Sequence, residues 1–158
     1  MIKKDPDFLD TYLLLYSILQ KENKLEEAEL VLDDAYNRAI NLIMDKNGNW
    51  PDVLEWGWME NRHVIRTILD KAICLWCHAQ FDEALDLFRK LLKTNPSDNV
   101  GAREYILAIR MNMSFVDFEE RFNKGGFYDQ DLDDWFEENY KKFPEEFGRW
   151  EKAIEKYM

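Results

Sequence analysis

The run Cys74-Leu75-Trp76-Cys77-His78 carries the strongest chemical signal in the sequence. Two thiols three residues apart, followed by an imidazole, match C-x-x-C-H, the pattern that attaches a c-type haem. On a helix the same spacing places Cys74, Cys77 and His78 on one face, where they could share a metal ion. One hypothesis is therefore a redox, metal-binding or haem-binding protein that uses these three side chains.

Other features of the sequence weigh against that hypothesis. Haem attachment of this type occurs in exported proteins, and acidic residues and Pro6 interrupt the amino-terminal stretch, so we expect no signal peptide. His63 lies about 16 Å from Cys74 along a helix, too far to supply a fourth metal ligand. We therefore expect packed free thiols, no cofactor, no metal and a cytoplasmic location, where thiols stay reduced.

The remaining residue types with catalytic potential occur in patterns typical of a solvated surface. The serines have no nearby histidine, and Gly125-Gly126 is not followed by the Lys-Ser/Thr of a phosphate loop. Adjacent carboxylates are frequent, but they fall on faces that we expect to be polar. These pairs are Glu26-Glu27, Asp33-Asp34, Asp133-Asp134, Glu137-Glu138 and Glu145-Glu146. We therefore predict no catalytic residue and no enzyme.

Composition limits the class of protein and of partner. The chain has 158 residues, of which 46% are apolar and 34% charged, so we expect one domain or one small array of repeats. A net charge of −11 argues against partners such as nucleic acid or an anionic membrane. No apolar run approaches the roughly 18–20 residues that span a bilayer.

The spacing of apolar residues predicts eight helices and no strand. Breaks are expected at 23–24, at 46–49, at 95–99 and at Gly125-Gly126, all of which contain turn-forming residues. The stretch 46–58 is expected to be an ordered loop, and its Trp50, Trp56 and Trp58 could form a binding lip or fill a gap in the packing. The predicted helices span residues 8–21, 25–45, 59–79, 81–93, 100–112, 115–122, 131–142 and 145–157.

A repeated pattern of residues follows the same helices. The slots of one helix hairpin are filled in order by Ile68, Lys71, Ala72, Leu75, Ala84, Phe88 and Pro96. Small residues at Ala72 and Ala84 would allow two helices to cross closely. A second copy lies 56 residues earlier, from Tyr12 to Leu32, and a weaker third copy uses Glu104, Leu107, Ala108 and Met111.

This pattern resembles the tetratricopeptide repeat family. The resemblance covers roughly residues 6–123, and it extends to a subgroup of small bacterial repeat proteins similar to the suppression-of-tumorigenicity-seven repeats. It implies an all-α, right-handed superhelix of helix hairpins. The whole chain, residues 1–158, would form a single domain with repeat-like units at 6–45, 59–96 and 97–123, an insertion at 46–58 and acidic capping helices at 131–158.

The resemblance also implies a function, because in this family the first helix of each repeat lines a concave groove. We expect a non-catalytic adaptor or scaffold that binds a protein or peptide, basic or amphipathic in character because the chain is acidic. Arg62 and Arg103 could face the ligand, but we expect each to form a buried salt bridge with a turn carboxylate. The oligomeric state is left open. By register, the groove residues are Arg66, Asp70, Ile73, Trp76, Tyr105, Ile109 and Asn112.

Overall fold

The computed structural model describes residues 5–156, and over that range it is all-α, as the sequence predicts. Eight α-helices are present there, and the only strand-like pairing is an isolated bridge between Asn123 and Tyr128. None of these helices is both long and apolar enough to cross a bilayer. The chain divides into two compact units, Met1–Lys71 and Ala72–Met158, and the division falls within α3 (Met59–Cys77).

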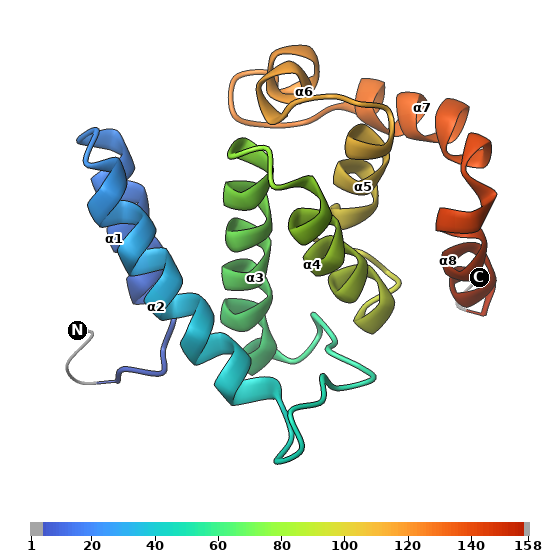
Figure 1. Ribbon diagram of the computed structural model, residues 1–158. Helices are drawn as coiled ribbons and strands as arrows, with labels where there is room; N and C mark the ends of the chain where they lie inside the picture. The colour runs from blue at the N-terminus through green and yellow to red at the C-terminus, as the bar shows by residue number, and fades with distance from the viewer. Residues whose placement is uncertain (1–4, 157–158) are drawn as a thin grey trace. The chain divides into compact units, whose positions relative to one another are not determined.

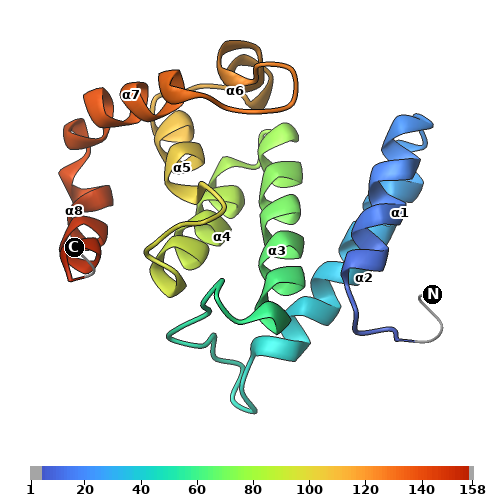
Figure 2. The same cartoon turned by 180° about the vertical axis from the view of Figure 1, so that it is seen from behind.

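In the first unit, α1 (Asp10–Lys21) and α2 (Leu25–Ile43) form an antiparallel hairpin (Figures 1 and 2). The turn between them contains Asn23 in the left-handed conformation, which asparagine tolerates better than most residues. The helical period places six apolar residues on one face of α2, and the four in the middle, Ala28, Leu32, Ala35 and Ala39, are buried. Leu25 and Leu42, at the two ends of this face, are 54% and 46% exposed.

The loop over residues 44–58 leads from this hairpin to α3, and its tryptophans differ in environment. Trp56 lies beneath the guanidinium groups of Arg62 and Arg66, with ring-centre distances of 5.0 and 5.3 Å. Arg62 also donates a hydrogen bond to the Trp56 carbonyl at 2.9 Å, in place of the expected salt bridge. Trp58 is 61% exposed, so packing accounts for Trp56 but not for Trp58.

The second unit contains the end of α3 and all later helices. These are α4 (Phe81–Thr94), α5 (Ala102–Arg110), α6 (Phe115–Phe122), α7 (Gln130–Asn139) and α8 (Pro144–Glu155), with a 3-10 turn at Tyr140–Lys142. Ser114 caps α6 by accepting a hydrogen bond from the Asp117 amide, and Pro144 occupies the first turn of α8. The predicted end of the last helix at Tyr157 lies outside the described residues. Superhelix handedness and the repeat boundaries stay predictions.

An aromatic core fills the second unit. Phe118 of α6 is fully buried, with ring-centre distances of 5.1–6.3 Å to its aromatic neighbours. Those neighbours are Trp76, Tyr105, Phe122, Tyr128 and Trp135. A second cluster joins Phe136 and Tyr140 to Phe147 and Trp150 of α8. The core therefore gathers side chains from five helices that cannot bury their apolar faces alone.

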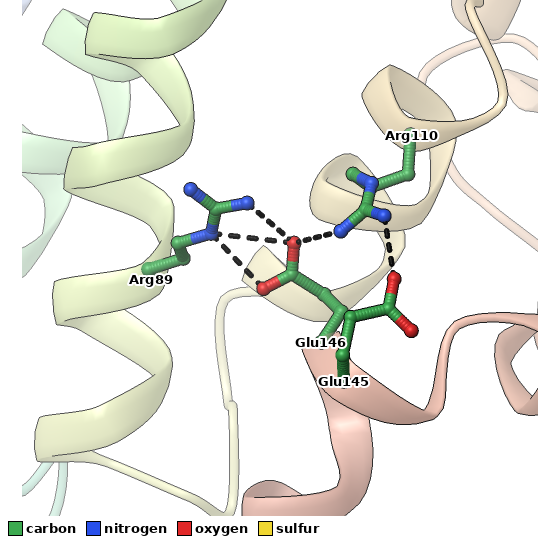
Figure 3. A network of polar contacts seen from close by, with 4 residues as sticks. All are labelled: Arg89, Arg110, Glu145 and Glu146. Carbon is green, nitrogen blue, oxygen red and sulfur yellow. Dashed lines mark hydrogen bonds and ion pairs between the residues drawn. The ribbon is translucent and has the colours of Figure 1, made fainter.

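An ion-pair network fastens the first turn of α8 to α4 and α5 (Figure 3). Both Arg89 and Arg110 donate to the Glu146 carboxylate, at 2.6 and 3.0 Å, and Arg110 also donates to Glu145 at 2.6 Å. Burial alone would favour the neutral acid, but the hydrogen bonds from the two guanidinium groups lower the pKa of Glu146. Glu146 is therefore held as a carboxylate between two cations.

The aromatic core predicts a large effect for Phe118→Ala. The substitution removes a ring that touches five others, so we expect the free energy of unfolding to fall by about 3–5 kcal/mol. Val116→Ala, on the same helix at a 62% exposed position, should change it by no more than about 0.5 kcal/mol. Urea unfolding of both variants measures the difference, and equal stabilities would contradict the position of Phe118 in the core.

The network in Figure 3 predicts a contrast between two adjacent glutamates. Glu146→Gln should lower the free energy of unfolding by about 1–3 kcal/mol, because two charge-assisted hydrogen bonds are weakened. Glu145→Gln, whose side chain is 61% exposed, should cost less than about 1 kcal/mol. Since the pKa of Glu146 is lowered in the folded state, its contribution persists above pH 4.5 and is lost below it. Urea unfolding at pH 7 and pH 3 measures both effects; the same loss at both pH values would contradict the ion pair.

Candidate functional site

The turn before α5 is built around the buried carboxylate of Asp98. Its two oxygens accept hydrogen bonds from the backbone amides of Ala102, at 2.8 Å, and Arg103, at 2.9 Å. These amides belong to the first turn of α5, where no helical carbonyl can accept from them. Asp98 therefore fixes where α5 begins and how its first side chains point.

Arg103 connects that turn to two other helices. Its guanidinium donates to Asp98 and pairs with Glu104 Oε1, both at 3.1 Å. The same group lies over the rings of Phe136 in α7, at 5.2 Å, and Trp150 in α8, at 5.8 Å. The expected salt bridge between Arg103 and a turn carboxylate is confirmed. One cation thus serves two buried carboxyl groups.

Glu104 is the carboxyl group that this arrangement leaves incompletely satisfied. The residue is only 5% exposed, and its Oε2 atom is buried without a hydrogen-bond partner in the structure. Gly101, with φ of +77°, lies beside it: a Cβ atom at this position would be 3.0 Å from Oε2. Glycine is required here both by the left-handed backbone and by the close approach of the carboxyl group.

A pocket of about 470 Å³ opens next to Glu104. We call it the Glu104 pocket, and it is formed by the start of α5, by α6 and by the segment that leads into α7. Asp129 caps α7 by accepting from the Asp131 amide, and the Tyr128 hydroxyl donates to Glu119. The side chains that give the pocket its character are Glu104, Tyr105, Phe118, Tyr128, Asp129 and Asp133.

The charged residues that line the Glu104 pocket determine the pKa values of its carboxyl groups. Burial raises the pKa of Glu104 to about 7; Arg103 opposes this shift, and the charges of Asp98 and Asp133 add to it. Burial also raises the pKa of Asp98, although Arg103 and two backbone amides act in the opposite direction. Near neutral pH the pocket therefore holds excess negative charge and a carboxyl group that gains or loses a proton readily. This arrangement favours a cationic ligand.

The structure places the predicted groove residues of the second unit mainly in its interior. Trp76, Tyr105 and Ile109 are each less than 9% exposed, and the Trp76 indole donates to the Met113 carbonyl at 3.1 Å. Ile73 is half-buried, and Asn112 is exposed beyond the end of α5. The expected binding role of these residues stays a prediction, but the packing assigns the first three to the core.

Two predicted groove residues, Arg66 and Asp70, belong to the first unit. Arg66 Nη1 donates to both carboxylate oxygens of Asp10, at 2.9 and 2.8 Å, so a structural partner engages this side chain. Asp70 is half-buried, and desolvation raises its pKa to about 6.

The Cys74–His78 run ends α3. Neither Cys74 nor Cys77 forms a disulfide bond; Cys74 is half-buried, and Cys77 and His78 are exposed. Partial burial, with the neighbouring Cys74 thiol, raises the pKa of Cys77 to about 11. In the protein without a bound metal, this environment disfavours the thiolate form of Cys77. The redox, metal or haem hypothesis for Cys74, Cys77 and His78 therefore stays a prediction.

The sequence pattern did not identify Glu104 as a functional residue, although a signal was present. Glu104 shares a helix face with Leu107 and Ala108, three and four residues further on, and both are buried. A glutamate on the apolar face of a short helix must be paired or must serve a ligand. The repeat pattern placed Glu104 at a position that packs between helices, so Glu104 was not considered as a ligand-binding residue.

The fold defines an all-α protein whose second unit carries an acidic pocket lined in part by aromatic residues. Comparison with models of known protein families, with curated proteins and with solved structures gives no match. The resemblance to tetratricopeptide repeats therefore rests on the residue pattern alone.

The buried carboxyl group predicts a specific pH dependence for Glu104→Gln. Because the folded state raises the pKa of Glu104 from 4.5 to about 7, wild-type stability should fall as pH rises through this interval. The amide cannot ionise, so the variant should gain stability relative to wild type over the same interval, by up to about 3 kcal/mol. Urea unfolding of both proteins at pH 5 and pH 8 measures this, and a difference that does not change with pH would contradict a raised pKa.

Proposed function

We propose that the protein is a binding module that engages a protein or peptide through positively charged side chains and carries out no catalysis. The observation that supports this most strongly is the Glu104 pocket, in which a buried carboxyl oxygen lacks a partner beside further acidic residues. A partner that presents a cation would supply the missing interaction.

The remaining features of the second unit fit the same role. Its helices are fastened by two aromatic clusters and by the network of Arg89, Arg110 and Glu146, so the pocket is built on a rigid support. A rigid site loses little conformational entropy on binding. The net charge of −11 would also speed the encounter with a basic partner.

The resemblance to tetratricopeptide repeats supports the same class of function, since those repeats act as protein-binding scaffolds. The proposal differs from the expectation in one respect. The binding residues we propose are Glu104, Asp129 and Asp133, at the start of α5 and of α7; of the expected groove residues, the lining of this pocket includes Tyr105.

A capture experiment with matched charge variants tests the proposal. Full-length wild type, Asp133→Asn and Glu138→Gln are immobilised and exposed to a lysate of the organism that encodes the chain. Both substitutions remove one exposed negative charge from α7, but only Asp133 lines the pocket. We expect Asp133→Asn to weaken binding of the captured partner about two- to fivefold and Glu138→Gln to leave it unchanged.

The captured partner is then purified, and its Kd is measured for wild type and for both variants. A partner that binds all three proteins equally, or the absence of any partner that wild type enriches over blank resin, would contradict the proposed function.

A further inference from the structure

We propose that the Glu104 pocket recognises the ammonium group of a single lysine side chain. This inference rests on the proposed function and specifies which chemical group of the partner enters the pocket. It draws on the charge balance around Glu104, on the number of carboxyl oxygens left available and on the aromatic residues that line the pocket.

The charge balance of the pocket favours a cationic ligand. Among the described residues that line the pocket, Arg103 alone is basic, and it is already shared between Asp98 and Glu104. Asp133 adds a further negative charge that acts on Glu104. A buried carboxylate without full compensation is costly, so an incoming cation gains the interaction that the free protein lacks.

The geometry of Glu104 favours lysine over arginine. An arginine guanidinium binds a carboxylate best through two parallel hydrogen bonds, which need both oxygens. Here Oε1 is paired with Arg103 at 3.1 Å, and only Oε2 lacks a partner. A lysine ammonium is a compact charge with three donors, so it can bond to one oxygen and direct its other donors elsewhere in the pocket.

The pocket walls suit the rest of a lysine side chain. Tyr105, Phe118 and Tyr128 line the pocket together with the carboxyl groups, and of these three rings Tyr128, at 40%, is the exposed one. Aromatic faces attract an ammonium group and also cover the apolar methylene stem of lysine. A small inorganic cation would leave these aromatic surfaces unused.

The arrangement of oxygens is also unsuited to a divalent metal ion. Calcium takes six to eight oxygen ligands, and magnesium demands near-octahedral geometry. Among the described residues of this pocket, no three acidic side chains bring ligand atoms within 4.8 Å of one another. The acidic groups line the pocket without converging on one point. This arrangement suits an organic cation, which is larger than a metal ion.

Binding must compete with protonation of Glu104. The charged groups that act on this carboxyl are Arg103 and Asp98 from the start of α5 and Asp133 from α7. Only the carboxylate form attracts an ammonium ion, so affinity should rise as pH increases from 6 to 8. Lysine remains protonated throughout that range.

An NMR titration of the full chain tests the inference. Amide spectra at pH 8 are recorded while Nα-acetyl-lysine amide is added, with Nα-acetyl-norleucine amide as the uncharged control. Parallel titrations use Nα-acetyl-arginine amide and calcium chloride. We expect saturable shifts at Gly101, Glu104 and Asp133 with the lysine probe, weaker binding of the arginine probe and no saturation with the other two.

Variants sharpen the result. Glu104→Gln should raise the Kd for the lysine probe about tenfold, because the ammonium group then meets a neutral amide oxygen and no longer a carboxylate, and Glu138→Gln should leave it unchanged. Equal binding of the norleucine or arginine probe, saturation by calcium, or an unchanged Kd in Glu104→Gln would overturn the inference. If the lysine probe fails while Asp133→Asn still weakens a captured partner, the proposed function survives and the lysine assignment does not.

Discussion

One guanidinium group holds together the part of the molecule on which its function depends. Arg103 pairs with Asp98, which fixes the start of α5, and with Glu104, which lines the pocket. It also lies over aromatic rings of α7 and α8. Because a single cation serves two buried carboxyl groups, one oxygen of Glu104 has no partner, and the chemistry of the pocket follows from this shortage.

A second buried carboxyl group in the same unit shows the opposite balance. Glu146 receives hydrogen bonds from both Arg89 and Arg110, and its pKa is lowered, whereas Glu104 shares one arginine and its pKa is raised to about 7. The carboxylate of Glu146 is paired with two arginines and fastens α8 to α4 and α5. The carboxyl group of Glu104 has one oxygen without a hydrogen-bond partner in the free protein. This contrast separates a structural carboxylate from one that is available to a ligand.

Periodicity alone predicted the helical architecture well, because each helix shows its buried face in its own sequence. Ser114 before α6 and Pro144 in α8 also marked helix ends correctly. The site was harder to predict, since it depends on contacts between distant segments. Trp76 was expected at a surface, but aromatic residues of α4, α5 and α6 enclose it. The pairing of Arg103 with a turn carboxylate was expected from the sequence, but its second pairing with Glu104 was not.

The account stands on the ionisation of Glu104, which can be observed directly. A pH titration of the side-chain carboxyl carbon of Glu104 by ¹³C NMR, in the free protein, follows this group alone. A midpoint near pH 7 is expected from burial beside Asp98 and Asp133 with only Arg103 in compensation. A midpoint at or below 4.5 would mean that the carboxylate is already fully stabilised, and it would contradict the role assigned to the pocket.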